Sequence, residues 1–315
     1  MPAQAAQSPP VAGTPAGVVR PLPGHAQAAV FDPATANLAV LSPGVGGQST
    51  VSVVPPSGET RPVPLPGPAT AITGDNDGRV YASTRGGYFR IDLRAGTVSR
   101  VDIEGQPGTD FTAIARRADG KLVLCSADGA VYTLSSDSTV GTSLKIFARV
   151  DALVTQGNTA VVLDRGQTSV TTISASGNDA DHALRAGEGA TTMAVDSAGR
   201  VLVADTRGDE LLVFGVDPLI LRQRYPVRDA PYGLAGSSPS RKGGDIRPGL
   251  AWVSQTAINT VVGYDLATGI PVEKVRYRTV QQPNSLAYDE ASGTLYVVSG
   301  SGAGVQIIAG AGISR

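Results

Sequence analysis

The chain has 315 residues and a mass of 32.0 kDa. Its 26 basic and 27 acidic residues give a formal net charge of -1, which argues against a nucleic-acid binder and against a polybasic membrane binder. One Cys excludes an internal disulfide, and two His exclude a site built from three imidazoles. No run approaches 18 apolar residues, so a membrane-spanning helix is not expected.

Residues 1–16, MPAQAAQSPPVAGTPA, contain no charge, no aromatic residue and no hydrophobic periodicity. This Pro/Ala-rich composition predicts a disordered tether. The stretch resembles the segment that follows the lipidated cysteine of a bacterial lipoprotein. That resemblance implies a leader and a lipid anchor absent from this chain, and an ordinary disordered terminus of a cytoplasmic protein is the alternative.

A repeat of about forty residues organises residues 17–315, which we expect to form one domain. Each repeat holds an apolar strand, a polar turn with Asp or Gly, and a second apolar strand. The second strands recur at intervals of 38 to 50 residues, at Leu38, Val80, Leu122, Ala160, Val201, Ala251 and Leu295.

A third apolar run follows each pair, as in AVYTL (130–134) and ELLVFGV (210–216), and a fourth follows six of them. Four strands every forty-odd residues are typical of a β-propeller blade. The seventh repeat stops after its third strand, and Val18–Pro23 resembles the fourth strand of another repeat. The sequence therefore predicts an all-β, seven-bladed β-propeller with four antiparallel strands per blade, the last blade being closed by the N-terminal strand.

Three stretches carry a family resemblance. TTMAVDSAGRVLVADTRGDELLVF (191–214) resembles an NHL repeat, and NTVVGYDLATGIPVEKV (259–275) with PNSLAYDEASGTLYVVS (283–299) resembles the YVTN type. Such repeats are common in exported bacterial surface proteins, and the composition resembles an actinobacterial, in particular mycobacterial, envelope lipoprotein. The resemblance implies the blade and says almost nothing about the ligand.

The side chains that usually carry chemistry are expected to be structural. We expect His25 and His182 to be surface or turn residues and Cys125, at the end of an apolar strand, to be a buried inert thiol. A set of aspartates falls at the turn between first and second strands, where a short acceptor shapes the turn: Asp32, Asp75, Asp119, Asp196 and Asp289. No catalytic, cofactor-binding or metal-binding residue is predicted.

Propeller ligands usually bind on the face formed by two kinds of loop, from fourth to first strand and from second to third strand. The polar residues that we expect on this channel-mouth face are Arg85, Asp110, Asp128, Asp151, Arg165, Glu188, Asp205, Arg207, Asp229, Gln255 and Asn284. A Ca2+ ion at an acidic mouth is a further hypothesis, because propeller lactonases hold such a cation. Their particular combination of Glu, Asn and Asp cannot be placed in this sequence.

The sequence thus favours a non-catalytic binding or scaffold protein of the bacterial cell envelope, extracytoplasmic and monomeric, with an unknown protein or small molecule as ligand and no cofactor. Membrane attachment would come only through the lipid anchor. A metal-assisted lactonase or other hydrolase with its site at the channel mouth is one alternative, and a cytoplasmic protein-interaction platform is another. An insertion in the sixth repeat, SSPSRKGGDIRPG (237–249), predicts a surface loop.

Overall fold

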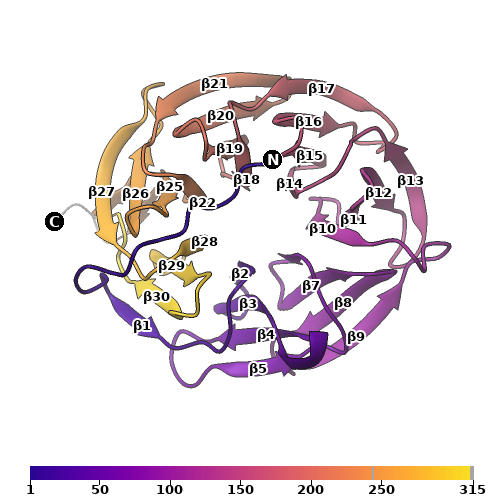
Figure 1. Ribbon diagram of the computed structural model, residues 1–315, viewed down its shortest axis with the longest axis horizontal. Coiled ribbons are helices and arrows are strands. Elements are labelled where there is room, and N and C mark those ends of the chain that lie inside the picture. Colours follow the sequence, from indigo (N-terminus) through magenta and orange to yellow (C-terminus); the bar gives the residue numbers. More distant parts are fainter. Residues whose placement is uncertain (243–244, 313–315) are drawn as a thin grey trace. The chain divides into compact units, whose positions relative to one another are not determined.

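The structure is a computed structural model that describes residues 1–242 and 245–312. Seven four-stranded antiparallel sheets make the fold an all-β, seven-bladed β-propeller (Figure 1). Contacts between residues divide the chain into two compact units. The middle unit is Ala26–Arg185, and the terminal unit is Met1–His25 together with the chain from Ala186 onward.

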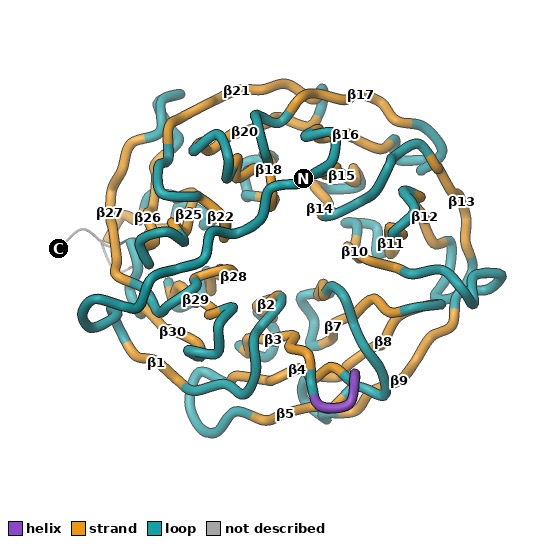
Figure 2. Tube along the Cα trace, viewed as in Figure 1, coloured by secondary structure: helices purple, strands orange, loops and turns teal. Residues whose placement is uncertain are grey.

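The middle unit contains four sheets, each ordered as its strands follow in the chain. They are β2 (Ala28–Asp32), β3 (Asn37–Pro43), β4 (Ser49–Val54) and β5 (Arg61–Pro64); β6 (Ile72–Gly74), β7 (Arg79–Thr84), β8 (Gly87–Asp92) and β9 (Thr97–Asp102); β10 (Phe111–Arg116), β11 (Leu122–Ser126), β12 (Ala130–Leu134) and β13 (Val140–Lys145); and β14 (Ala152–Gln156), β15 (Thr159–Asp164), β16 (Ser169–Ile173) and β17 (Ala180–Arg185). A short 3-10 helix, η1 (Val45–Gly47), precedes β4, and the tube in Figure 2 shows how strands and loops alternate in each sheet.

The terminal unit contains three sheets and a small hairpin. They are β18 (Ala190–Val195), β19 (Arg200–Asp205), β20 (Glu210–Val216) and β21 (Leu219–Pro226); β22 (Pro231–Gly236), β25 (Leu250–Gln255), β26 (Thr260–Asp265) and β27 (Val272–Arg278); β28 (Pro283–Asp289), β29 (Thr294–Ser299), β30 (Val305–Ile308) and β1 (Val18–Arg20); and the hairpin β23 (Ser240–Lys242) and β24 (Asp245–Arg247).

The last sheet joins the two ends of the chain, as the sequence predicts. β1 pairs antiparallel with β30, and Val18, Val19 and Arg20 lie opposite Ile307, Gln306 and Val305. The β1 strand ends at Arg20, three residues earlier than predicted. Pro21 and Pro23 follow it, and proline has no backbone N–H to extend the ladder.

Burial follows strand position within each blade. All seven predicted second-strand positions are buried, with Leu38, Val80, Val201 and Leu295 fully so. Outer strands alternate instead, as in β27, where Val275 and Tyr277 are half-buried between exposed neighbours. Second and third strands carry buried residues on both faces, as in β19 and β20, whereas fourth strands such as β27 meet water on one face.

Apolar clusters join adjacent sheets within each unit. In the middle unit Val51 and Val53 of one sheet pack with Phe89 and Ile91 of the next. In the terminal unit Trp252 packs between Tyr277 and Tyr288, with ring centroids 6.2 and 6.1 Å away. This packing is the main stabilising contact between consecutive blades.

Threonine hydroxyls add a second tie between blades, one that the sequence analysis did not find. Thr70 donates to the carbonyl of Phe111 at 2.7 Å, and Thr112 donates to that of Val150 at 3.2 Å. Thr192 donates in the same way to the carbonyl of Tyr232. In each case the acceptor lies at or just before the first strand of the next blade.

The turn aspartates perform the structural role predicted for them. Asp75 Oδ1 accepts from the amides of Asp77 and Arg79 at 2.8 and 3.0 Å, and Asp196 Oδ1 accepts from those of Ala198 and Arg200, both at 3.0 Å. Asp32 reaches the next blade, since its Oδ1 accepts from the amide of Gly78 at 2.9 Å. A short carboxylate therefore fixes the turn backbone.

Two sequence predictions need correction. The insertion 237–249 was expected to be a loop, but six of its residues pair as the hairpin β23–β24; residues 243–244 lie outside the described part of the chain. The run SLKIFARV (143–150) predicted an outer strand that in the structure is β13, at Val140–Lys145. Within the described residues, no helix is long and apolar enough to cross a membrane.

Candidate ligand-binding face

Every predicted site residue lies at or next to a loop from fourth to first strand or from second to third strand. In an antiparallel blade these two loops share one end of the sheet. The loop face of each unit is the surface formed by these loops within that unit.

In the middle unit the predicted residues form separate pairs. Arg85 and Asp110 lie 3.7 Å apart as an exposed ion pair. Asp151 is almost fully buried, and its carboxylate accepts from the amide of Arg165 at 3.0 Å and pairs with Arg149. The structure thus brings the Asp151 carboxylate to the backbone of Arg165.

Asp128 is placed apart from these pairs. Its carboxylate receives the Lys145 ammonium of β13 at 2.6 Å and the hydroxyl of Ser126. The hydrogen bond from Lys145 holds the pKa of Asp128 below its usual value, with a further contribution from Ser126. This carboxylate is therefore an exposed charge with its own partner.

In the terminal unit Asp205 is the centre of the first loop pair. The carboxylate is fully buried and accepts from three backbone amides, those of Glu188 and Gly189 at 2.8 Å and that of Gly208 at 3.1 Å. Gly187 and Gly208 approach so closely that a Cβ on either would overlap this carboxylate. Asp205 therefore ties the loop β17–β18 to the loop β19–β20.

Gln255 and Asn284 are tied to neighbouring loops in the same way. Gln255 is buried, donates to the carbonyl of Arg228 at 2.9 Å and accepts from Arg276 at 2.7 Å. Asn284 Oδ1 accepts from Gln282 at 2.9 Å. Asp229 lies in the loop β21–β22 with a positive φ of 67°, and its carbonyl accepts from the amide of Ala257.

The N-terminal segment is the part of this face that sequence reasoning missed. Residues 1–16, predicted to be a disordered tether, make specific hydrogen bonds along the loops of the terminal unit. In Figure 1 the indigo segment that precedes β1 runs over this unit past β22. Ala3 and Ser8 are buried there, and the guanidinium of Arg207 donates to the carbonyl of Met1 at 2.8 Å.

The expectation of disorder rested on composition alone. Ala, Pro and Gln offer no periodic apolar face that would signal packing. The segment is instead held through its backbone by amide side chains 250 or more residues away, such as those of Gln282 and Asn259. The only sequence signal was the Asn/Gln content of the receiving loops, 255–259 and 281–284.

The remaining candidate nucleophile and bases are placed as expected. Cys125 is fully buried, and burial raises the pKa of its thiol well above the usual range. His25 and His182 are exposed, His25 in the connection between β1 and β2 and His182 on β17. Across residues 1–242 and 245–312, no three His, Cys, Asp or Glu side chains come together as a metal site.

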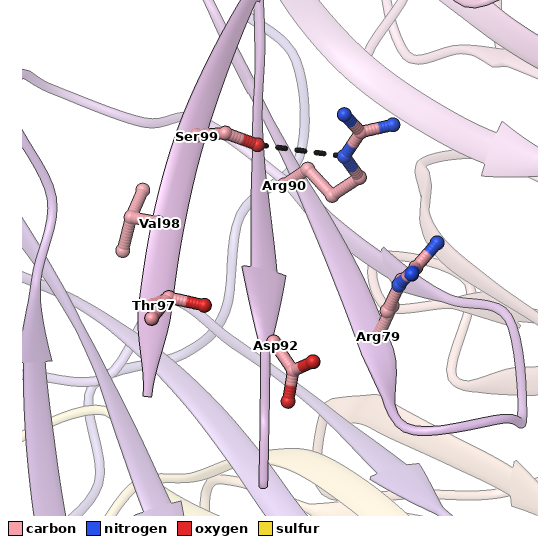
Figure 3. Close-up of a pocket in the computed structure, with 6 residues that line it drawn as sticks. All are labelled: Arg79, Arg90, Asp92, Thr97, Val98 and Ser99. Atoms are coloured by element: carbon pink, nitrogen blue, oxygen red, sulfur yellow. Dashed lines mark hydrogen bonds between the residues drawn. The ribbon is translucent and has the colours of Figure 1, made fainter. Parts of the chain in front are cut away.

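Two cavities lie away from the predicted residues. One of about 300 Å³ is lined by Arg79, Arg90, Asp92, Thr97, Val98 and Ser99. Figure 3 shows Arg79 and Arg90 beside Asp92 there, with Arg90 Nε donating to Ser99 Oγ at 3.4 Å. Arg90 is also paired with Asp137 at 3.1 Å. A second cavity, of about 380 Å³, lies between the turn 196–200, the insertion and the turn 265–267 of the terminal unit.

Comparisons with known proteins identify the fold. No family model matches the chain, and no curated protein matches it. A streptogramin B lyase structure is similar with a TM-score of 0.71 at 10% identity, covering 93% of this chain and 96% of that one. A chain of a mitotic checkpoint complex has a TM-score of 0.76 at 11% identity, with coverages of 98% and 96%.

Virginiamycin B lyase from Staphylococcus aureus has a TM-score of 0.68 at 12% identity and coverages of 90% and 94%. A lyase and a checkpoint complex share no activity, so likeness at this level of identity carries the architecture alone. The chain is therefore similar to seven-bladed β-propellers over almost its whole length.

Proposed function

We propose that this protein is a non-catalytic binding or scaffold propeller of a bacterial cell envelope, and that its partner binds at a loop face. The observation that carries the proposal is the use of the buried polar side chains in the loop face of each unit. Asp205, Asp151 and Gln255 are engaged with backbone groups of neighbouring loops. Buried polar groups satisfied in this way give the loops a fixed shape on which a partner can dock.

A catalytic site would use such carboxylates differently. General bases and metal ligands need oxygens directed toward a substrate or an ion. At Asp205 both oxygens instead receive amides, Oδ2 from Glu188 and Oδ1 from Gly189 and Gly208. This carboxylate therefore supports a structural role within a binding surface.

The envelope location is supported by two features of the sequence. Residues 1–16 resemble the tether of a lipoprotein, and residues 191–214 and 259–299 resemble repeats that are common in exported bacterial proteins. Fractionation of cells that express the full gene tests this part of the proposal. Recovery in the membrane or envelope fraction is expected, and recovery with cytoplasmic markers contradicts it.

The binding face is tested by site-specific photo-crosslinking. A photo-reactive phenylalanine derivative replaces Arg207 on the loop face or, as the control, Ser197 in the turn at the other end of the same blade; both residues are exposed. We expect a discrete adduct with an envelope component from position 207 only. Equal adducts from both positions, or none from either, would contradict the proposal, and saturable Ca2+ binding by calorimetry would favour the hydrolase instead.

A further inference from the structure

We propose that the loop face of the terminal unit is a binding site for an extended, uncharged peptide, and that residues 1–9 occupy it as an intramolecular ligand. This inference rests on the proposed function and names the class of partner. A partner segment of the same chemistry, rich in Ala and Pro with a small hydroxyl residue, would take the site by displacing residues 1–9. We use the name peptide-binding loops for the loop residues that contact the segment or lie beside those that do: 188–189, 207, 255–259 and 281–284.

Amide side chains bind the segment by its backbone. Gln282 contacts it twice, because its Oε1 accepts from the amide of Ser8 at 2.9 Å and its Nε2 donates to the carbonyl of Ala6 at 2.8 Å. Paired contacts to both kinds of backbone group are the pattern by which an added strand is recognised. Such contacts hold an extended chain whatever its side chains.

Two more amides continue this pattern along the segment. Gln281 Nε2 donates to the carbonyl of Ser8 at 3.2 Å, and Asn259 Nδ2 donates to that of Pro9 at 2.8 Å. Three amide side chains thus bind four backbone groups within four consecutive residues. Neutral amides do this without a charged partner, which suits a ligand that carries no charge.

Two positions of the segment are selected for small side chains. Ser8 is 5% exposed, and its hydroxyl donates to the carbonyl of Thr256 at 2.5 Å. Ala3 is 7% exposed and lies against Gly189, where a Cβ added to the glycine would be 2.9 Å from that of Ala3. A larger residue at either ligand position would have to displace a loop.

Other positions of the segment are more open. Gln4, Gln7 and Pro9 are exposed, whereas Ala5 and Ala6 are half-buried. The site therefore specifies small residues five positions apart and an uncharged, extended backbone between them. This is recognition by backbone and shape, and it explains how a sequence of low complexity can be held specifically.

Gln282 and Asn259, which bind the segment, are also held in position by contacts that do not involve it. Gln282 and Asn259 both have positive φ, 56° and 51°, a conformation that is costly for a side chain such as Gln. They support each other, since the amide of Gln282 donates to Asn259 Oδ1 at 3.2 Å. Gln282 is further oriented by Asn284, its hydrogen-bond partner at 2.9 Å.

The segment can leave without opening a sheet. Residues 1–17 form no strand in the described structure, whereas β1 and its pairing begin at Val18. Residues 10–16 then act as a short linker between the site and β1. A linker of this length gives an effective local concentration in the millimolar range, which a free partner peptide must overcome.

The test uses a variant that lacks residues 1–10 and a fluorescent peptide with the sequence of residues 1–13, MPAQAAQSPPVAG. Fluorescence polarisation should show saturable binding to the truncated protein and binding at least about tenfold weaker to the full chain, whose site is already occupied. Gln282→Ala in the truncated protein removes two hydrogen bonds and should weaken binding about tenfold or more. Gln48→Ala, on a loop of the middle unit, is the matched control and should bind normally.

A peptide with Ser8→Arg tests the size selection and should not bind measurably. Circular dichroism and the fluorescence of Trp252 establish that the truncated protein is folded. If that folded protein does not bind the peptide, or if the full chain binds it equally well, the inference is wrong. If position 207 gives a crosslink, position 197 gives none and the peptide does not bind, this inference is wrong while the proposed function is still supported.

Discussion

Among single residues, Asp205 has the most demanding position in the terminal unit. It is a carboxylate with no exposed surface, surrounded by amides of two loops and by two glycines that leave no room for a Cβ. Burial of a charge is unfavourable unless hydrogen bonds replace its hydration. The three backbone donors supply that replacement, and in return the carboxylate fixes the loops on which the proposed peptide lies.

Replacing Asp205 with Ala should therefore be strongly destabilising. Three backbone amides, that of Gly189 buried and those of Glu188 and Gly208 partly buried, would lose their acceptor, and we expect a loss of about 2–4 kcal/mol in the free energy of unfolding. Urea denaturation followed by Trp252 fluorescence measures it. Asp110→Asn is the control, because its ion pair with Arg85 is 3.7 Å long and exposed, and it should change stability by less than about 0.5 kcal/mol. Equal effects of the two substitutions would show that Asp205 is not the organising group.

Asp128 gives a contrasting prediction about pH. The hydrogen bond from Lys145 lowers the pKa of Asp128 in the folded protein, and the same bond raises the pKa of Lys145. The contribution of Asp128 is therefore present above its unfolded pKa, near 3.9, and is lost as the pH falls through the lowered value. The contribution of Lys145 is present at neutral pH and is lost only as the pH rises through its raised value.

Asp128→Asn should consequently lower the melting temperature slightly at pH 7, by about 1 °C or less, because both side chains are largely exposed. The difference from the unaltered protein should shrink as the pH falls toward 2, because Asp128 becomes protonated, and in 1 M salt, which screens exposed pairs. Differential scanning calorimetry of both proteins at pH 7, at pH 2 and in 1 M salt measures these differences in melting temperature. A difference that persists in acid would have to come from something other than this ion pair.

At the scale of elements, strand positions were predictable because they repeat. Second-strand positions such as Val201 and Leu295 recur at intervals near forty residues, and the sequence around them shows no hydrophobic periodicity of a helix. The hairpin β23–β24 was missed because the insertion 237–249 is rich in Gly, Ser and Pro, which favour a loop. The insertion also contacts residues far along the chain, since the carboxylate of Glu290 accepts from the amide of Ser238 at 2.7 Å.

The candidate site was predictable only as a set of loops. The 2–3 and 4–1 connections follow from the strand count, so their polar residues could be named from the sequence. The sequence could not show which of these residues contact each other. Pairs such as Asp205 with the amide of Gly189 depend on the backbone path of both loops. The position of the N-terminal segment could not be predicted for the same reason. Its partners bind its backbone, so its side-chain pattern carries no sign of the contact.

The pairing of β1 with β30 gives an element-scale prediction. Gly17 has a φ of 71°, and a Cβ there would overlap the carbonyl oxygen of Ile307 on β30. Gly17→Ala should lower the free energy of unfolding by about 2–3 kcal/mol, about 1 kcal/mol from the left-handed backbone and the rest from displacement of the strand. Chemical denaturation measures the loss, and amide exchange in β30 should rise with it.

Gly46→Ala separates the two causes. This glycine has the same φ of 71°, yet nothing lies within 4 Å of an added Cβ. It should lose only the backbone part, about 1 kcal/mol. If Gly17→Ala and Gly46→Ala were equally destabilising, close packing of β1 on β30 would not be what Gly17 protects.

At the scale of the whole molecule, one sheet is built from both ends of the chain. Val18–Arg20 must find Val305–Ile307 across nearly the full length of the polypeptide, and such long-range pairing is slow to form. Without β1, the row of N–H and C=O groups on β30 would become an open sheet edge. Open edges of this kind pair with other chains and promote aggregation.

Two truncations test how much the closure contributes. Removal of residues 1–26 deletes β1 together with the buried Leu22, and we expect the melting temperature to fall by about 10 °C or more, with light scattering that rises as the protein unfolds. Removal of residues 1–10 deletes only the segment on the loop face and should lower the melting temperature by about 1–3 °C. Calorimetry with simultaneous light scattering compares the two. Similar melting temperatures for both truncations would mean that β1 adds no stability beyond that of residues 1–10. In that case the pairing of β1 with β30 would not be what stabilises the last blade.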